Sequence, residues 1–83
     1  MSEERVRETI FDALHRIAPE VDPQTLDPGV DLREQADLDS MDFFNLLVAV
    51  SEALQVEIPE ADAPRLTTLD GAVAYLAGRA QVG

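Results

Sequence analysis

Apolar residues recur at steps of three and four along three stretches of the chain. This spacing predicts three principal helices over about residues 2–18, 40–54 and 68–78. A fourth, short helix is expected over about residues 60–63, because Pro64 follows. No segment alternates with period two, so no sheet is expected. The pattern therefore predicts an all-α fold, a small bundle of three principal helices and one short helix.

The ends of the predicted helices carry the residue types that start and stop helices. Ser2 is placed to cap the first helix, and Pro19 stops it. Asp39 is placed to cap the second helix, with Asp42 reaching back as in a variant capping box. Gly78 is the expected stop of the last helix.

A long loop over residues 19–39 joins the first two helices. Asp22 and Pro23 can open a single helical turn within it. Four spaced apolar residues are expected to pin the loop to the core: Val21, Leu26, Val30 and Leu32. Between residues 20 and 42 the chain has eight acidic residues and one base, Arg33. This is either a solvated loop or a negative surface that faces a partner.

The second helix has two apolar faces. On a helical wheel with Ser40 at zero, a core stripe falls between roughly 240° and 340°: Phe43, Leu46, Leu47, Val50 and Leu54. A second group, here called the outer strip, falls between roughly 40° and 100°: Met41, Phe44 and Val48. Asn45 and Glu52 border the strip on one side, and Ser40 and Ser51 on the other. Either the long loop covers the outer strip, or the strip is an exposed docking surface.

Composition and charge narrow the class of partner. A chain of 83 residues is expected to form one domain, residues 1–83, and a monomer. Six Lys+Arg against 17 Asp+Glu give a net charge of −11, which repels nucleic acids and anionic membranes and attracts basic protein surfaces. The longest apolar run, residues 46–50, is too short for membrane insertion. With an acidic amino end and no cysteine, a cytoplasmic protein is expected.

Catalytic and metal sites are not supported by the residues present. His15 has no second histidine or cysteine with which to bind zinc, and it is the only candidate base for a serine hydrolase. A calcium loop counted from Asp37 would have Asp42 where glycine is required and Val48 where glutamate is required. The four glycines are isolated, so no phosphate-binding loop is present. We expect no enzyme and no metal site.

Ser40 stands at the start of the second helix, after the acidic loop. A phosphate ester on its hydroxyl would lie where unpaired backbone N–H groups and the positive end of the helix dipole gather. The simpler interpretation is that Ser40 helps to cap the helix.

The sequence around Ser40 resembles that of acyl carrier proteins. Asp39-Ser40-Met41-Asp42 is similar to their prosthetic-group site, and Val56-Glu57-Ile58-Pro59-Glu60 is similar to the turn after their second helix. Leu66-Thr67-Thr68-Leu69, followed by Ala72-Val73-Ala74-Tyr75-Leu76, resembles their last helix. The continuous resemblance covers about residues 32–76, and the three motifs occur at the right separations.

The resemblance implies a bundle of the acyl-carrier type in which Ser40 receives 4′-phosphopantetheine from coenzyme A, through a separate phosphopantetheinyl transferase that uses magnesium. The thiol of this arm would carry an acyl chain as a thioester between acyl-loading and acyl-processing enzymes of fatty acid, polyketide or related lipid biosynthesis. Their basic docking surfaces would face Asp39 and Asp42. Met41, Phe44 and Val48 would make the apolar contacts, with Asn45 and Glu52 beside them.

Departures from the family pattern suggest a specialised set of partners. Asp37 stands where the family has glycine, although aspartate tolerates a left-handed backbone better than most residues. Positions that often hold glutamate in the family keep a single acid: Asn45, Ser51, Glu52 and Ala53. The bulky Phe43 in the core stripe predicts a tight interior. Two alternatives stay open: an aminoacyl or peptidyl carrier, against which the charge of −11 argues, and an unmodified helical interaction module, against which the intact Ser40 argues.

Overall fold

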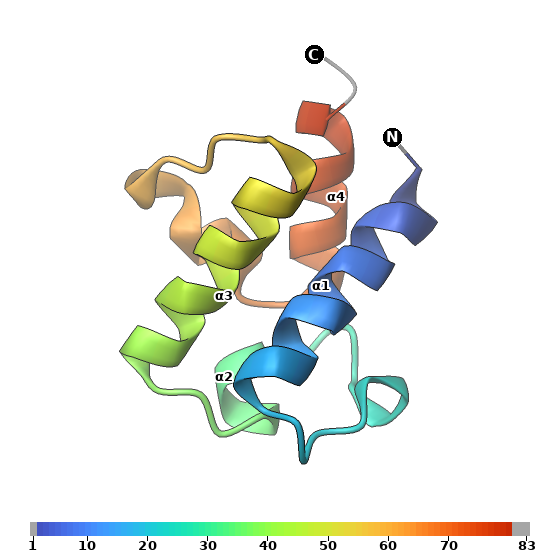
Figure 1. Cartoon of the computed structure of the whole chain (residues 1–83), viewed down its shortest axis with the longest axis vertical. Helices are drawn as coiled ribbons and strands as arrows, with labels where there is room; N and C mark the ends of the chain where they lie inside the picture. The colour runs from blue at the N-terminus through green and yellow to red at the C-terminus, as the bar shows by residue number, and fades with distance from the viewer. Residues whose placement is uncertain (1, 81–83) are drawn as a thin grey trace.

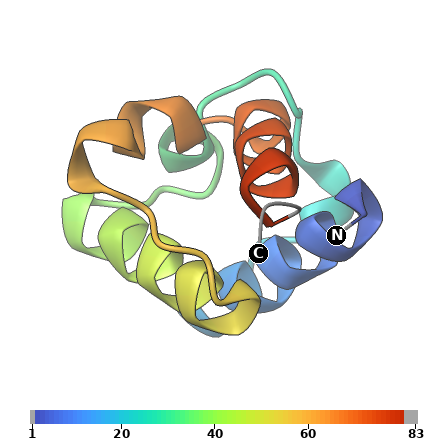
Figure 2. The same cartoon turned by 90° about the horizontal axis from the view of Figure 1, so that it is seen from above.

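The computed structural model describes residues 2–80, which form a bundle of helices without a β-strand (Figure 1). The elements in chain order are α1 (Glu3–Ile17), the 3₁₀ helix η1 (Pro23–Thr25), α2 (Leu32–Gln35), α3 (Ser40–Leu54), the 3₁₀ helix η2 (Glu60–Leu66) and α4 (Leu69–Ala80). α1 packs against both α3 and α4, and η2 packs against α4 (Figure 2). The predicted all-α bundle is confirmed.

The two predicted N-caps are present. The Ser2 hydroxyl accepts a hydrogen bond from the Arg5 amide at 3.2 Å, and Asp39 Oδ1 accepts one from the Asp42 amide at 2.8 Å. Asp42 makes no return bond to the Asp39 amide among the hydrogen bonds of the described residues, so the predicted capping box is reduced to a single cap. One cap of this kind stabilises a helix by about 1 kcal/mol.

The long loop holds more structure than its sequence predicts. The expected turn is η1, where Asp22 Oδ1 accepts from the Gln24 amide at 3.0 Å. The helix α2 was not predicted, because four residues are too few to show a helical period. Asp31 caps it through the Arg33 amide at 2.8 Å.

Two other predicted boundaries are wrong. η2 continues past Pro64 to Leu66, whereas the sequence predicted an end at residue 63. Pro64 has no N–H to donate in either kind of helix, but its fixed φ of about −65° lies within the 3₁₀ range, so the turn continues past it. α4 runs to Ala80 because Gly78 is accommodated inside it, at a cost of about 1 kcal/mol relative to alanine.

Backbone hydrogen bonds tie the long loop to the start of α4. The Leu32 amide donates to the Thr67 carbonyl at 2.7 Å, and the Asp70 amide donates to the Pro28 carbonyl at 3.0 Å. Leu32 and Leu26 are buried, as predicted, and Val21 is half-buried. Val30 is 37% exposed, so the prediction that it anchors the loop is wrong.

The core lies between α1, α3, α4 and the loop. The predicted core stripe of α3 is fully confirmed, since all five residues are buried: Phe43, Leu46, Leu47, Val50 and Leu54. They pack in one cluster with Ile10 and Leu14 of α1 and with Leu76 of α4. A void lined by eight core residues, Ile10, Leu46 and Leu76 among them, has a volume of about 10 Å³. This is room for about one water molecule, which agrees with the predicted tight interior.

Two residues other than glycine have a left-handed backbone. Asp37 has φ 54°, so aspartate does adopt the turn at the position where the family has glycine. Gln55, at the C-cap of α3, has φ 56° and ψ 41°. Gln55→Gly is expected to raise the free energy of unfolding by about 0.5–1 kcal/mol, because glycine enters this region without a Cβ clash. Urea denaturation measures the change, and a lower free energy of unfolding would contradict it.

A polar cluster joins η2 to α4. The Tyr75 hydroxyl donates to Asp62 Oδ2 at 2.6 Å, and Arg79 donates to the same oxygen at 3.1 Å. The Arg79 guanidinium also lies 4.7 Å from the centre of the Tyr75 ring. Burial raises the pKa of Tyr75, and its hydrogen bond to Asp62 raises it further.

We expect Tyr75 to titrate above about pH 10, the ordinary value of tyrosine. Since the folded state raises this pKa, the stabilisation is complete below pH 10 and is lost as the pH rises through the folded-state pKa. Tyr75 is the only tyrosine, so absorbance at the phenolate band reports it alone. Asp62→Ala should move the midpoint back towards 10, and a wild-type midpoint at or below 10 would refute the assignment.

Candidate functional site

Ser40 is the first residue of α3, and its side chain is exposed. Capping of α3 is done by Asp39, and the Ser40 hydroxyl forms no hydrogen bond within the described part of the chain. The interpretation of Ser40 as a cap is therefore not supported. The amides of Ser40 and Met41 belong to the first turn, where no helical carbonyl is available to them. The hydroxyl is thus free for chemistry beside a helix end that favours an attached anion.

The surroundings of Ser40 are strongly acidic. Asp37 and Asp39 are exposed and Asp42 is half-buried, and all three lie within the six residues from 37 to 42 that include Ser40. Arg33 is bound to Asp31, with Arg33 Nη2 at 2.7 Å from Asp31 Oδ2. The side-chain hydrogen bonds of Arg33 hold the pKa of Asp31 below its usual value. The negative surface around Ser40 is complementary to a basic partner surface.

The outer strip of α3 is exposed, so the long loop does not cover it. Met41 is 69% exposed, Phe44 57% and Val48 37%. The strip runs along α3 away from Ser40, with exposed Asn45 and Glu52 on its border. Six residues of the predicted partner surface are exposed on α3 or at its N-cap, and Asp42 is half-buried: Asp39, Met41, Phe44, Asn45, Val48 and Glu52 are the exposed ones.

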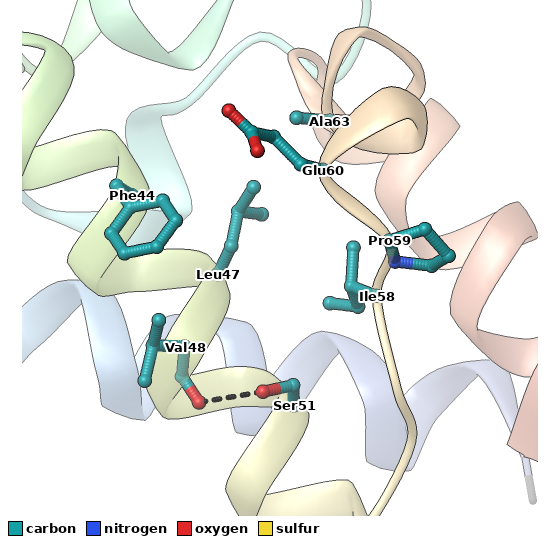
Figure 3. Close-up of a pocket in the computed structure, with 8 residues that line it drawn as sticks. All are labelled: Phe44, Leu47, Val48, Ser51, Ile58, Pro59, Glu60 and Ala63. Carbon is teal, nitrogen blue, oxygen red and sulfur yellow. Dashed lines mark hydrogen bonds between the residues drawn. The ribbon is translucent and has the colours of Figure 1, made fainter.

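A groove of about 110 Å³ lies beside the outer strip, between α3 and the segment that leads into η2 (Figure 3). Phe44 and Val48 form one wall, and Ile58, Pro59 and Ala63 form the other. Its polar groups are the Glu60 side chain and Ser51, whose hydroxyl donates to the Val48 carbonyl at 2.8 Å. The outer strip therefore continues into an apolar hollow.

The second wall of the groove was not found by sequence reasoning. Ile58 and Pro59 were recognised only as part of a family turn, because no periodic pattern extends over so short a segment. Their place opposite Phe44 depends on how the segment folds back over α3. In contrast, the helical wheel was sufficient to find the outer strip, because all its residues share one helix.

Comparison with known proteins identifies the family. The family model described as "Phosphopantetheine attachment site" matches residues 4–76. The acyl carrier protein of Rubrobacter xylanophilus is 33% identical over 73 residues, which are 84% of this chain and 90% of that protein. The chain belongs to the acyl carrier proteins. Members of this family carry covalently attached 4′-phosphopantetheine and are carriers rather than catalysts.

Among residues 2–80 no three His, Cys, Asp or Glu side chains are grouped to hold a metal ion. No helix in this part of the chain has both the length and the apolar content needed to cross a bilayer. An acyl carrier needs one accessible hydroxyl for the prosthetic group, and Ser40 is exposed at the first position of α3.

Proposed function

We propose that Ser40 is the residue to which 4′-phosphopantetheine is attached, and that the chain shuttles acyl intermediates between enzymes. The observation that carries this proposal is the exposed hydroxyl of Ser40. This hydroxyl does not cap α3, because the Asp39 side chain does so. Bound there, the group supplies the terminal thiol for a thioester, which a chain without cysteine lacks. The pathway proposed is a cytoplasmic one, of fatty acid, polyketide or related specialised lipid biosynthesis.

The residues of α3 have distinct tasks in attachment. The Ser40 oxygen loses its proton and forms a P–O bond to the phosphorus next to the pantetheine part of coenzyme A. The pyrophosphate P–O bond on the nucleotide side of that phosphorus breaks, and adenosine 3′,5′-bisphosphate leaves with the electron pair. The unpaired amides at the start of α3 stabilise the negative phosphate. Asp39 keeps this first turn in place through its bond to the Asp42 amide. The proton acceptor and the magnesium ion belong to the phosphopantetheinyl transferase, a separate protein.

Partners are proposed to dock on the exposed side of α3. Met41, Phe44 and Val48 supply apolar contact, while Asp39, Asp42 and Glu52 pair with basic residues, and Asn45 lies between the two. The net charge of −11 supports basic partner surfaces. The large, apolar outer strip with few glutamates beside it supports a specialised set of acyl-loading and acyl-processing enzymes. The chain is proposed to act as a monomer that binds these partners in turn.

The test is the intact mass of the purified chain after incubation with a permissive phosphopantetheinyl transferase, magnesium and coenzyme A. Wild-type protein should gain one phosphopantetheinyl group, and Ser40→Ala should gain none. Ser51→Ala is the matched control, because Ser51 is on the same helix but its hydroxyl is bonded to the Val48 carbonyl. It should be modified like the wild type.

Two results would contradict the proposal. A mass gain in Ser40→Ala would place the group elsewhere. No gain in folded wild-type protein, with a transferase active on another carrier, would favour an unmodified interaction module.

Cargo is tested by loading octanoyl and alanyl groups from their coenzyme A thioesters through the same transferase. A rise in the free energy of unfolding on alanyl loading that exceeds the rise on octanoyl loading would favour an aminoacyl carrier.

A further inference from the structure

Arg33 lies against the first turns of α3. The carbon at the centre of its guanidinium is 5.4 Å from the centre of the Phe43 ring. Phe43 follows Ser40 by three residues, and residues at this spacing on a helix have Cβ atoms about 5–6 Å apart. The loop between them turns back on itself, because the Leu38 amide donates to the Arg33 carbonyl at 3.0 Å. The contact with Phe43 therefore places the guanidinium against the residue that lies one turn after Ser40 on α3.

Asp31 orients the Arg33 side chain. Arg33 Nε lies 3.1 Å from Asp31 Oδ1, and Nη2 lies 2.7 Å from Asp31 Oδ2. This two-point contact uses one edge of the planar guanidinium. The guanidinium has five N–H donors in all. Its other terminal nitrogen, Nη1, donates to no residue that the structure describes. Asp31 therefore holds the Arg33 side chain in one orientation, and the N–H groups of Nη1 are available for a further hydrogen bond.

We infer that Arg33 is a positioning residue for the prosthetic group: it donates hydrogen bonds to the phosphodiester on Ser40 and holds the base of the arm against α3. This inference rests on the proposed attachment at Ser40. A phosphodiester there adds a negative charge close in the chain to Asp37, Asp39 and Asp42. Residues 20–42 hold eight acidic residues and a single basic residue, Arg33. Arg33 is therefore the nearest positive charge in the sequence that can offset the charge of the phosphodiester.

The chain provides a matched control arginine. Arg79 is bound to Asp62 at 3.1 Å and lies over the Tyr75 ring, as Arg33 is bound to Asp31 and lies over Phe43. The two arginine side chains are 46% and 48% exposed. Arg79 is in the last turn of α4, and Figure 1 shows the end of α4 far from the start of α3. Arg79→Gln thus removes an equivalent arginine that is not beside Ser40.

The experiment uses nuclear magnetic resonance of the holo protein. Attachment of the group to the wild type should shift the Arg33 Nε resonance and leave that of Arg79 in place. The phosphorus resonance should move in Arg33→Gln towards that of free 4′-phosphopantetheine, whereas Arg79→Gln should keep the wild-type value. Arg33→Lys retains the positive charge but lacks the planar guanidinium, so its phosphorus resonance should lie between those of the wild type and Arg33→Gln. Salt at about 1 M should move the wild-type phosphorus resonance in the same direction as Arg33→Gln.

The outcomes separate this inference from the proposed function. Identical phosphorus shifts in Arg33→Gln and Arg79→Gln, with no change at Arg33 Nε on attachment, would overturn the positioning role while Ser40 is still loaded. Absence of the mass gain at Ser40 would instead overturn the proposed function. The Arg33 Nε measurement needs no variant, so it decides the question even if Arg33→Gln unfolds.

Discussion

Replacing Met41 and Phe44 together by serine is expected to lower kcat/KM for modification of Ser40 by a phosphopantetheinyl transferase by about 100-fold. The two side chains are 69% and 57% exposed, more than any other large apolar side chains that the structure describes. Truncating one well-placed apolar contact at an interface costs about 1–2 kcal/mol, and two such losses correspond to about a hundredfold in rate constant. The rate is measured from intact mass over time, at carrier concentrations below KM.

The controls for this prediction use two valines of equal exposure. Val48, in the outer strip, and Val30, in the long loop, are both 37% exposed. Val48→Ser should slow modification several-fold, whereas Val30→Ser should leave its rate unchanged. The thermal midpoint of every variant should stay close to that of the wild type, because the side chains changed are at the surface. A double variant modified within twofold of the wild-type rate would contradict docking on the outer strip.

Phe43→Ala is expected to lower the free energy of unfolding of the apo protein by about 3–5 kcal/mol, the usual cost of removing a buried phenylalanine. Phe43 is 8% exposed and belongs to the core cluster. A chain of this length has a total stability of about 4–12 kcal/mol, so the loss is a large share of the whole. The neighbouring Phe44→Ala is the matched control, since its ring is outside the core and should cost about 0.5 kcal/mol or less.

The same variant tests whether the tight interior limits cargo. An octanoyl group, loaded from octanoyl coenzyme A, should stabilise Phe43→Ala more than it stabilises the wild type, because removal of the buried ring leaves a new cavity in the core that the acyl chain can fill. Urea denaturation of the apo and loaded forms measures both effects. Equal costs for the two phenylalanine variants would show that Phe43 is not part of the core. Equal stabilisation by octanoyl would show that the acyl chain lies elsewhere.

The helices and their inner faces could be predicted from the sequence because the information is local. A stripe repeats every three or four residues within one helix, so Phe43 and Leu46 were assigned to the core stripe and Phe44 to the separate outer strip without knowledge of the fold. Capping is also local: the Asp39 carboxylate reaches an amide only three residues away. The position of Ser40 at the start of a helix followed from these two patterns.

Features built from segments far apart in the chain could not be predicted. The helix α2 is short and is anchored by the bond between the Leu32 amide and the Thr67 carbonyl, 35 residues away in sequence. No local pattern indicates that bond. Val30 was expected to be buried because of its spacing from the other apolar residues of the loop. It is exposed, because hydrogen bonds at Pro28 and Leu32 fix the loop to the start of α4 on either side of it.

The sequence by itself determined the all-α class, the helix carrying Ser40, and the presence of a second apolar strip on that helix, because each depends on contacts within a few residues. The tertiary structure decided that this strip is exposed, since the long loop does not cover it. Only the tertiary structure decided that Ile58 and Pro59 close a groove opposite Phe44, and that Arg33 lies over Phe43 one turn from Ser40. Such contacts form when whole elements pack against one another. Their geometry is set by the shape of the shared core, which no single segment encodes.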